Sequence, residues 1–380
     1  MPLADYNLRL YEPSSFAFAA DKPDSKQVAV MMSGGVDSSV TAHLLKEAGF
    51  DVVGITMRIP VACGVQSRGC CGADAAYVCT QLGIAHYFVD VTQAFNQEII
   101  ESFRQSYKEG RTPNPCVDCN TMLKFSLLWD AVQQELGVQN FATGHYARVL
   151  RTPNGARLAR GLDQDKDQSY FIYGLTPEKL EHFYLPLGDY SKPQVRNIAL
   201  NIELGVAEKA ESMELCFAGE GDYRIALGLD NADKPGDITD MQGNKIGTHK
   251  GIANYTLGQR RGLGFAAGEP VYVGRIDPVN NIVALGKRDE VTQSTILAKN
   301  INVLVPDELV EGAQLFGKIR SGGHPKPCRV TEIKGGRSLF SLSVEFDEPQ
   351  FAPCPGQRLV LYNREGHVIA GGVIEKKLES

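Results

Sequence analysis

The first half of the chain alternates short apolar runs with amphipathic, helix-like stretches. The pattern predicts strands at 28–31, 52–56, 86–89 and 141–143, and helices at 38–48, 73–82, 95–109 and 121–136. Strands and helices that alternate in this way form a parallel, doubly wound sheet, which binds ligands at the carboxyl ends of its strands. We therefore expect an α/β doubly wound domain whose functional residues follow its strands.

The second half of the chain has a different pattern. A basic hairpin at 148–160, a polar run and a helix near 192–204 end the α/β region, and from about residue 235 short strands alternate with Gly, Pro and Asn turns. Such strands are typical of small sheets and barrels. The predicted domains are an N-terminal extension at 1–26, the α/β domain at 27–218, a central mostly-β domain at 219–293 and a C-terminal β-barrel at 294–380.

Composition and charge narrow the class of protein. Of the 380 residues, 43% are hydrophobic and 22% are charged, which is typical of a soluble globular protein. No apolar run approaches the roughly 20 residues of a membrane span. The first 26 residues include several acidic side chains and lack a signal-peptide pattern, so we expect a cytoplasmic protein. Because the net charge is −6, any nucleic-acid surface must come from a local cluster of Lys and Arg.

A turn rich in glycine and serine joins the first predicted strand to the first helix. It reads Met31, Met32, Ser33, Gly34, Gly35, Val36, Asp37, Ser38 and Ser39. Glycines let backbone N–H groups turn inward and a helix N-terminus adds partial positive charge, so the turn favours an anion such as a nucleotide phosphate. Asp37 would repel that anion, which argues for a bridging Mg²⁺. The turn has no Walker lysine.

Two further candidates follow strands of the same sheet. Met57 comes after the second strand, and Gly144, His145 and Tyr146 come after the last. Gly144 would admit a ribose or a base close to the backbone, while the imidazole of His145 would reach a second substrate. We expect both strand ends to lie beside the nucleotide.

The nine cysteines suggest metal, redox or nucleophilic chemistry more than a disulfide framework, because the chain has no secretory signal. Cys116 and Cys119 form a C-x-x-C motif in a proline-stiffened loop, directly before a helix that contains Lys124. At the start of that helix and close to Lys124, the Cys119 thiol should have a lowered pKa. The spacing alone leaves redox, metal-binding and nucleophilic roles open.

The remaining cysteines and a basic segment receive weaker predictions. Cys63, Cys70, Cys71 and Cys79 lack the paired spacing of a zinc site, so we expect packing or a mobile substrate loop, with Cys79 on the core face of its helix. Cys328 and Cys354 are expected in the core, and Cys216 is isolated in sequence. The basic, glycine-rich stretch at 255–264 suits contacts with a phosphate backbone.

Several motifs occur together, in order, along nearly the whole chain. They are Ser33–Ser39, Gly110–Asn120, Ala142–Tyr146, Gly161–Phe171, Cys216-Phe217-x-Gly219 and Thr256–Gly264. The first resembles the PP-loop of the ATP pyrophosphatases, and the full set resembles the tRNA-specific 2-thiouridylases. The resemblance implies a PP-loop catalytic domain (adenine nucleotide alpha hydrolase-like), a small central domain and a C-terminal β-barrel that together hold a tRNA with a wobble uridine.

The same resemblance implies roles for individual residues. ATP would bind at Met31–Ser38 with Met57 and Gly144 beside the adenosine, and uridine O2 would attack the α-phosphate. Cys216 would carry a persulfide from a sulfur-relay partner or cysteine desulfurase, and Cys119 would be the nucleophile that frees the sulfur or closes a disulfide with Cys216. The implied tRNA contacts are Asn114, Pro115 and Cys116 at the target base, and His145, Lys166, Asp167, Gln168, Arg320, Ser321 and Gln357.

Cys116 departs from the family pattern and is compatible with a second mechanism. Many members have a catalytic aspartate where this chain has Cys116. The trio Cys116, Cys119 and Cys216 resembles the set that holds a [4Fe-4S] cluster in related tRNA-thiolating enzymes, where an open iron would bind free sulfide. A thiolate that ligates a cluster is not free to carry sulfur, so the cluster and the persulfide exclude each other. The sequence leaves both mechanisms open.

Two other functions are compatible with parts of the chain. A PP-loop synthetase that adenylates a small molecule would share the ATP site but would not need the three cysteines. A noncatalytic tRNA-binding protein would use the barrel without forming AMP.

Overall fold

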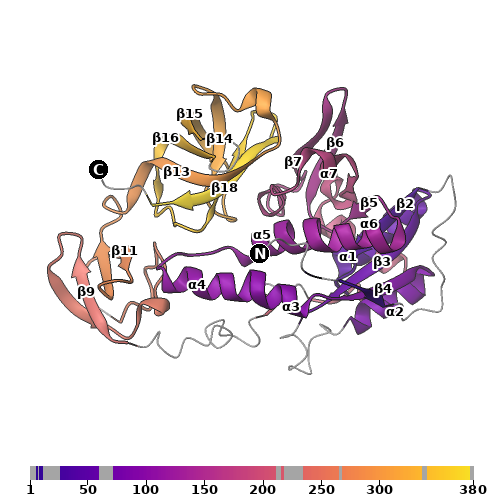
Figure 1. Ribbon diagram of the computed structural model, residues 1–380, viewed down its shortest axis with the longest axis horizontal. Helices are drawn as coiled ribbons and strands as arrows, with labels where there is room; N and C mark the ends of the chain where they lie inside the picture. The colour runs from indigo at the N-terminus through magenta and orange to yellow at the C-terminus, as the bar shows by residue number, and fades with distance from the viewer. Residues whose placement is uncertain are drawn as a thin grey trace. The chain divides into compact units, whose positions relative to one another are not determined.

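A computed structural model describes residues 6, 8–11, 26–59, 72–210, 215–217, 234–264, 268–335 and 340–376. The chain divides into two compact units (Figure 1). The first comprises Met1–Ile99, Cys116–Tyr223 and Gly366–Val368, and the second comprises Ile100–Pro115, Arg224–Glu365 and Ile369–Ser380. Cys63, Cys70 and Cys71, most of the predicted N-terminal extension and the predicted boundary at 218/219 lie outside the described residues. The predicted domain boundaries stay predictions.

A six-stranded sheet organises the first unit, with the strand order β1-β4-β3-β2-β5-β8. The strands are β1 (Leu10–Tyr11), β2 (Gln27–Met31), β3 (Asp51–Arg58), β4 (Ala85–Asp90), β5 (Asn140–Ala142) and β8 (Phe183–Tyr184). Neighbouring strands are parallel, except that β1 runs antiparallel to β4. The strand order reverses between β2 and β5, which makes that crevice the topological switch point where doubly wound sheets bind ligands. The predicted α/β fold is confirmed.

Helices close to the predicted ranges connect these strands. They are α1 (Val36–Glu47), α2 (Ala73–Leu82), α3 (Thr92–Ala94) continued by η3 (Phe95–Glu101) and α4 (Ser102–Lys108), then α5 (Pro115–Asp118), η4 (Cys119–Leu128), α6 (Trp129–Leu136), α7 (Pro177–Glu181) and α8 (Lys192–Asn201). The basic hairpin is β6 (Ala147–Thr152) and β7 (Gly155–Arg160), and short 3₁₀ turns are η5 (Ser169–Phe171) and η6 (Pro186–Asp189).

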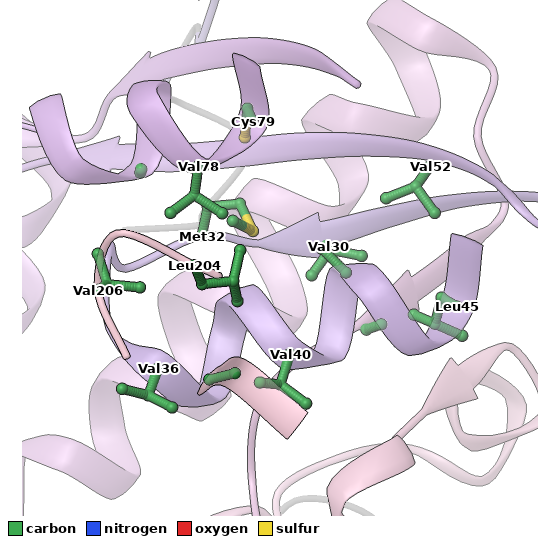
Figure 2. Close-up of a cluster of buried hydrophobic side chains, with 14 of the residues drawn as sticks. Val30, Met32, Val36, Val40, Leu45, Val52, Val78, Cys79, Leu204 and Val206 are labelled. Atoms are coloured by element: carbon green, nitrogen blue, oxygen red, sulfur yellow. The ribbon is translucent and has the colours of Figure 1, made fainter. Parts of the chain in front are cut away.

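Alternating side chains of the sheet pack against helices on its two faces. Val28, Val30 and Val52 point toward one face, where they form a buried cluster with side chains of α1, α2 and α8 (Figure 2). Phe141 lies next to Ala142 in β5 and therefore points to the opposite face, where Trp129 of α6 stacks on it with ring centroids 4.9 Å apart. Cys79 is fully buried in the first cluster, as predicted.

The helix that carries the C-x-x-C motif begins earlier than predicted. We expected a loop through residue 120 and a helix at 121–136, but the helix starts at Pro115 and runs without interruption through α5, η4 and α6. Proline fits the first turn of a helix because its missing N–H would have no partner there. Cys116 and Cys119 therefore project from one helical face, three residues apart.

From residue 234 onward, the described residues of the second unit form strands and short 3₁₀ turns, as predicted. A four-stranded sheet has the order β10-β9-β12-β11, built from β9 (Gly236–Asp240), β10 (Lys245–His249), β11 (Tyr272–Asp277) and β12 (Ile282–Gly286). A closed barrel follows, of β13 (Thr292–Val303), β14 (Gln314–Lys318), β15 (Lys326–Lys334), β16 (Ser341–Phe351), β17 (Arg358–Tyr362) and β18 (Val368–Glu375). Short 3₁₀ turns are η7 (Ile252–Asn254) and η8 (Pro306–Glu308). Cys328 and Cys354 are buried, as predicted.

Candidate active site

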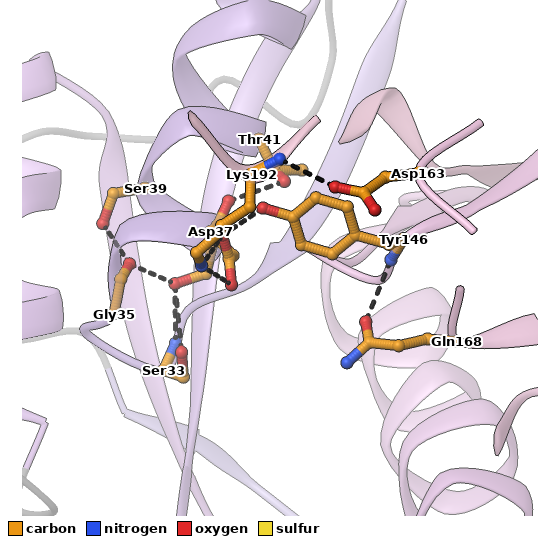
Figure 3. Close-up of polar contacts among 10 residues, drawn as sticks. Ser33, Gly35, Asp37, Ser39, Thr41, Tyr146, Asp163, Gln168 and Lys192 are labelled. Carbon is orange, nitrogen blue, oxygen red and sulfur yellow. Dashed lines mark hydrogen bonds and ion pairs between the residues drawn. The ribbon is translucent and has the colours of Figure 1, made fainter. Parts of the chain in front are cut away.

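The Ser33–Ser38 turn lies at the switch point, between the end of β2 and the start of α1. Gly34 has φ +69°, and a Cβ there would lie 2.8 Å from the Cβ of Asp74, so glycine is required. The Ser33 N–H donates to Ser38 Oγ at 3.2 Å, and the Ser38 and Ser39 hydroxyls both lie within 3.1 Å of the Gly35 carbonyl oxygen (Figure 3). These bonds hold the turn in its compact shape.

Asp37, in the first turn of α1, is paired with a lysine that is distant in sequence. The Lys192 ammonium donates to both Asp37 carboxylate oxygens at 2.8 Å, and the Tyr146 hydroxyl donates to one of them, also at 2.8 Å (Figure 3). The Lys209 ammonium donates to the Gly34 carbonyl oxygen at 3.0 Å and pairs with Asp74. Sequence reasoning missed both lysines and found in Ser191-Lys192-Pro193 only a helix start.

Gly144 follows β5 and packs directly on the start of α1. A Cβ at Gly144 would lie 2.9 Å from the Asp37 carbonyl carbon and from the Ser38 nitrogen. Glycine is required here because the backbone of α1 fills the space that a side chain would need. A contact between Gly144 and the nucleotide stays a prediction. Met57 lies near the carboxyl end of β3, half-buried, on the same edge of the sheet as the turn.

The three cysteines Cys116, Cys119 and Cys216 come within electrostatic reach of one another and of Lys124. Burial, with smaller contributions from the neighbouring Cys119 and Cys116, raises the pKa of the Cys216 thiol to about 12, while Lys124 opposes the rise. Cys116 and Cys216 keep exposed surface and Cys119 is buried. The structure thus brings together the isolated Cys216 and the C-x-x-C motif.

The prediction of a lowered Cys119 pKa is wrong. Burial raises the pKa of this thiol, and the nearby Cys116 and Asp118 add to the rise. Lys124 lowers the pKa, as expected, but burial outweighs it. The helix N-terminus does not lower the Cys119 pKa either, because the helix begins at Pro115 and Cys119 lies beyond its first turn. In this state the thiol is protonated at neutral pH.

His145 is part of a polar chain that starts at Lys124. Lys124 Nζ donates to Asn120 Oδ1 at 2.8 Å, and Asn120 Nδ2 lies 3.5 Å from His145 Nε2. Because that amide nitrogen is only a donor, Nε2 accepts, and the ring proton sits on Nδ1, 2.6 Å from Thr143 Oγ1. Burial, together with the positive charge of Lys124, lowers the His145 pKa to about 3, so its imidazole is neutral.

The residues matched to tRNA contacts in the first unit have structural partners. Asp167 is buried, pairs with Arg160 at 3.0 Å and accepts the N–H groups of Gly161 and Ser169. Gln168 Oε1 accepts the Tyr146 N–H at 2.9 Å. Their side chains fix the loop that presents Lys166, which is half-buried. Direct tRNA contact by this trio stays a prediction.

Arg320, Ser321 and Gln357, which are also matched to tRNA contacts, belong to the second unit. Gln357 Nε2 donates to the Thr112 and Pro113 carbonyl oxygens, each at 3.1 Å, just before the buried Asn114 and Pro115. Arg320 donates to the Phe351 and Ala352 carbonyl oxygens, and Ser321 is exposed. Arg260 and Arg261 of the basic segment are also exposed. Their contacts with tRNA stay predictions.

The described residues offer a limited set of metal ligands. Among them, no three His, Cys, Asp or Glu side chains are arranged to hold a metal ion. A [4Fe-4S] cluster at the cysteine trio stays a prediction. A nucleotide-bound Mg²⁺ needs only one or two carboxylates beside phosphate oxygens, so Asp37 fits that use. In the described part of the chain, no helix combines the length and apolar character that crossing a membrane demands.

Comparison with protein families covers almost the whole chain. The model described as "tRNA methyl transferase HUP domain" matches residues 26–220, "tRNA methyl transferase PRC-barrel domain" matches 228–287, and "Aminomethyltransferase beta-barrel domain" matches 293–374. These three matches follow the same order as the parallel sheet, the four-stranded sheet and the barrel of the structure.

Curated relatives match over nearly their full lengths. The tRNA-specific 2-thiouridylase MnmA 1 of Caldanaerobacter subterraneus subsp. tengcongensis is 43% identical, over 93% of this chain and 99% of its own. MnmA of Carboxydothermus hydrogenoformans is 42% identical, over 93% and 98%. Among solved structures, the U34-tRNA thiolase NcsA of Methanococcus maripaludis aligns over 56% of this chain and 68% of its own, with 20% identity and a TM-score of 0.34, too low to support a functional argument.

Proposed function

Because this chain belongs to the tRNA-specific 2-thiouridylase family, we propose that it replaces O2 of the wobble uridine of tRNA by sulfur at the expense of ATP. One observation carries the proposal beyond family membership. Cys116, Cys119, Cys216 and Lys124 lie within electrostatic range of one another, in the same compact unit that holds the Ser33–Ser38 turn. An ATP site and a group of thiols are the two components that ATP-dependent thiolation needs.

The first step is the activation of uridine O2. ATP binds on Met31–Ser38, with Met57 and Gly144 at the neighbouring strand ends, and O2 attacks its α-phosphate as pyrophosphate leaves. Asp37 and the phosphate oxygens would hold Mg²⁺, which would supply positive charge beside the phosphates. The step turns O2 into part of an AMP leaving group, so that a sulfur nucleophile can displace it from C2.

The second step transfers sulfur. A donor protein leaves a persulfide on Cys216, and its terminal sulfur attacks C2 while AMP leaves. The Cys119 thiolate then attacks Cys216 Sγ, which breaks the bond between Sγ and the transferred sulfur and releases 2-thiouridine. Two thiols have supplied the two electrons that reduce the transferred sulfur, so a Cys119–Cys216 disulfide remains, and an external dithiol reduces it before the next turnover.

The positive charge beside the thiols supports the persulfide route. Lys124 carries a positive charge that acts on all three thiols and lowers their pKa values, which favours the thiolate that attacks Cys216. The proposed partners are a tRNA with a wobble uridine and a persulfide-carrying donor protein, and the proposed compartment is the cytoplasm.

The experiment that tests this function follows three products of one reaction. Purified protein is incubated with tRNA, MgATP and a persulfide donor, and 2-thiouridine, AMP and pyrophosphate are measured. We expect equal amounts of the three, and loss of 2-thiouridine in Cys119→Ser and in Cys216→Ser. Cys328→Ser, in the barrel core, serves as the cysteine control.

AMP formed on a small molecule without tRNA, independently of Cys119, would instead indicate a PP-loop synthetase. Binding of tRNA without AMP formation would indicate a noncatalytic protein.

A further inference from the structure

The Ser33–Ser38 turn needs a positive charge that its own sequence does not contain. A nucleoside triphosphate brings several negative charges to the start of α1, where Asp37 already carries one. The Ser38 and Ser39 hydroxyls contact the Gly35 carbonyl oxygen, so they also serve the turn itself. A cation from elsewhere in the fold would balance the charge of the bound anion.

Lys192 is placed at the turn by the start of α8. Its backbone N–H donates to Asp163 Oδ2 at 3.1 Å, and the preceding Ser191 forms a capping box with Gln194. The side chain then extends past the Tyr146 ring, with the ammonium 5.6 Å from the ring centroid, to reach Asp37 (Figure 3). The position of the ammonium is thus fixed by the backbone hydrogen bond to Asp163 and by the contact with Asp37.

The ion pair is unevenly buried. The Lys192 side chain is 10% exposed and the Asp37 side chain is 33% exposed, so solvent reaches the pair from the side of the carboxylate. A lysine ammonium has three N–H donors on a flexible stem, and it can contact a phosphate oxygen while it keeps a bond to Asp37. Many phosphate-binding loops use a lysine, which contacts the phosphate as a point charge.

We propose that Lys192 is the phosphate-binding cation of the Ser33–Ser38 turn, held on Asp37 until the polyphosphate of a nucleoside triphosphate binds. The proposal rests on the proposed function, because it assumes that the turn binds ATP. It assigns to α8, which is 155 residues away in the chain from Asp37, the role that a Walker lysine has within its own loop.

The test must separate phosphate contact from simple neutralisation of Asp37. We would therefore compare Asp37→Asn with the double variant Asp37→Asn/Lys192→Met, both full-length and both without the Asp37 charge. The double variant leaves neither partner of the pair as an uncompensated charge, so it should fold. The probe is inorganic pyrophosphate in the presence of a chelator, titrated calorimetrically without tRNA, with thermal unfolding as the folding check.

We expect Asp37→Asn to bind pyrophosphate and the double variant to bind it about tenfold more weakly, as loss of one charge-assisted hydrogen bond predicts. Asp37→Asn/Lys192→Arg should retain most of the affinity. Equal affinities with and without Lys192, or no pyrophosphate binding by Asp37→Asn, would overturn the proposal. Failure of the unaltered protein to bind MgATP would overturn the ATP step of the proposed function instead, so the two failures are distinguishable.

Discussion

The Lys124 ammonium donates a 2.8 Å hydrogen bond to Asn120 Oδ1, one turn earlier on the same helix. The amide nitrogen of Asn120 donates in turn to the Phe171 carbonyl oxygen at 3.0 Å. Lys124 therefore has a defined position beside the cysteine trio, where its charge lowers all three thiol pKa values against the larger effect of burial.

Lys124→Met should slow the alkylation of these thiols. With the positive charge removed, burial and the repulsion between neighbouring thiolates are less opposed, so the thiolate fraction falls at any given pH. We expect a several-fold lower rate of iodoacetamide labelling of Cys216 at pH 8, measured by peptide mass spectrometry. Lys124→Arg should restore the rate. Lys46→Met, on the surface of α1, is the matched control, and an equal effect of both methionine variants would refute this role of Lys124.

The pH dependence of the same labelling reports the Cys216 pKa. Because that pKa is raised to about 12, the thiolate fraction and hence the labelling rate should rise about tenfold per pH unit from pH 7 to 10. An ordinary cysteine would level off near its usual pKa. A plateau at or below pH 9 in the tRNA-free protein would contradict the raised pKa of this thiol.

Gly144→Ala should damage the nucleotide site and the fold together. The added methyl group would press on the backbone of Asp37 and Ser38 at 2.9 Å, and overpacking of this kind costs about 1–3 kcal/mol. We expect a lower free energy of unfolding in urea and weaker MgATP binding. Gly322→Ala is the control, since nothing lies within 4 Å of its Cβ position. Unchanged ATP affinity in Gly144→Ala would contradict the close packing of Gly144 on α1.

Asp167 and Lys166 should respond differently to substitution. Asp167→Asn breaks a pair with Arg160 in which the Asp167 side chain is fully buried, and losing one partner of a buried pair costs about 3–5 kcal/mol. Lys166→Ala should leave unfolding unchanged but weaken tRNA binding, with the slope of log affinity against log salt reduced by about 1. The two variants are compared by urea unfolding and by tRNA titration at several salt concentrations. A stable Asp167→Asn, or an unaltered salt slope in Lys166→Ala, would contradict the respective assignment.

Acid should destabilise the protein through two histidines whose pKa values are lowered in the folded state. Burial lowers the pKa of His86 to about 4, and burial and Lys124 lower that of His145 to about 3, against an ordinary 6.5. The unfolded chain therefore binds protons that the folded chain does not, so this contribution is complete above pH 6.5 and is lost as the pH falls toward 4. His86→Gln should reduce the drop in unfolding free energy between pH 7 and 5. An identical drop in both proteins would contradict the burial of a neutral His86.

The parallel sheet could be predicted from the sequence because its strands are buried on both faces and give uniform apolar runs. β2, for example, includes the buried residues Val28, Ala29 and Val30 and is followed by a turn rich in glycine and serine. The barrel was predicted from turn residues in the same way. Helix starts were less certain, and the early start at Pro115 moved Cys119 away from the helix N-terminus.

The partners of the site could not be predicted because they come from distant segments. The contact between Asp37 and Lys192 depends on how α8 packs on α1, through buried residues such as Val195 and Val40, and no local pattern encodes that distance. The direction of the Cys119 pKa shift was missed for a similar reason. Burial of a thiol depends on what the folded chain places around it, while a neighbouring lysine is visible in the sequence.

A single turnover, analysed without reducing agent, tests the central claim most directly. Protein purified without oxygen is assayed for iron, loaded with persulfide, and mixed with tRNA and MgATP. The peptides are then analysed by mass spectrometry. We predict one Cys119–Cys216 disulfide for each 2-thiouridine formed, in protein that contains no iron. Thiolation that needs bound iron, is lost in Cys116→Ala and leaves no such disulfide would contradict the persulfide account and establish a cluster enzyme.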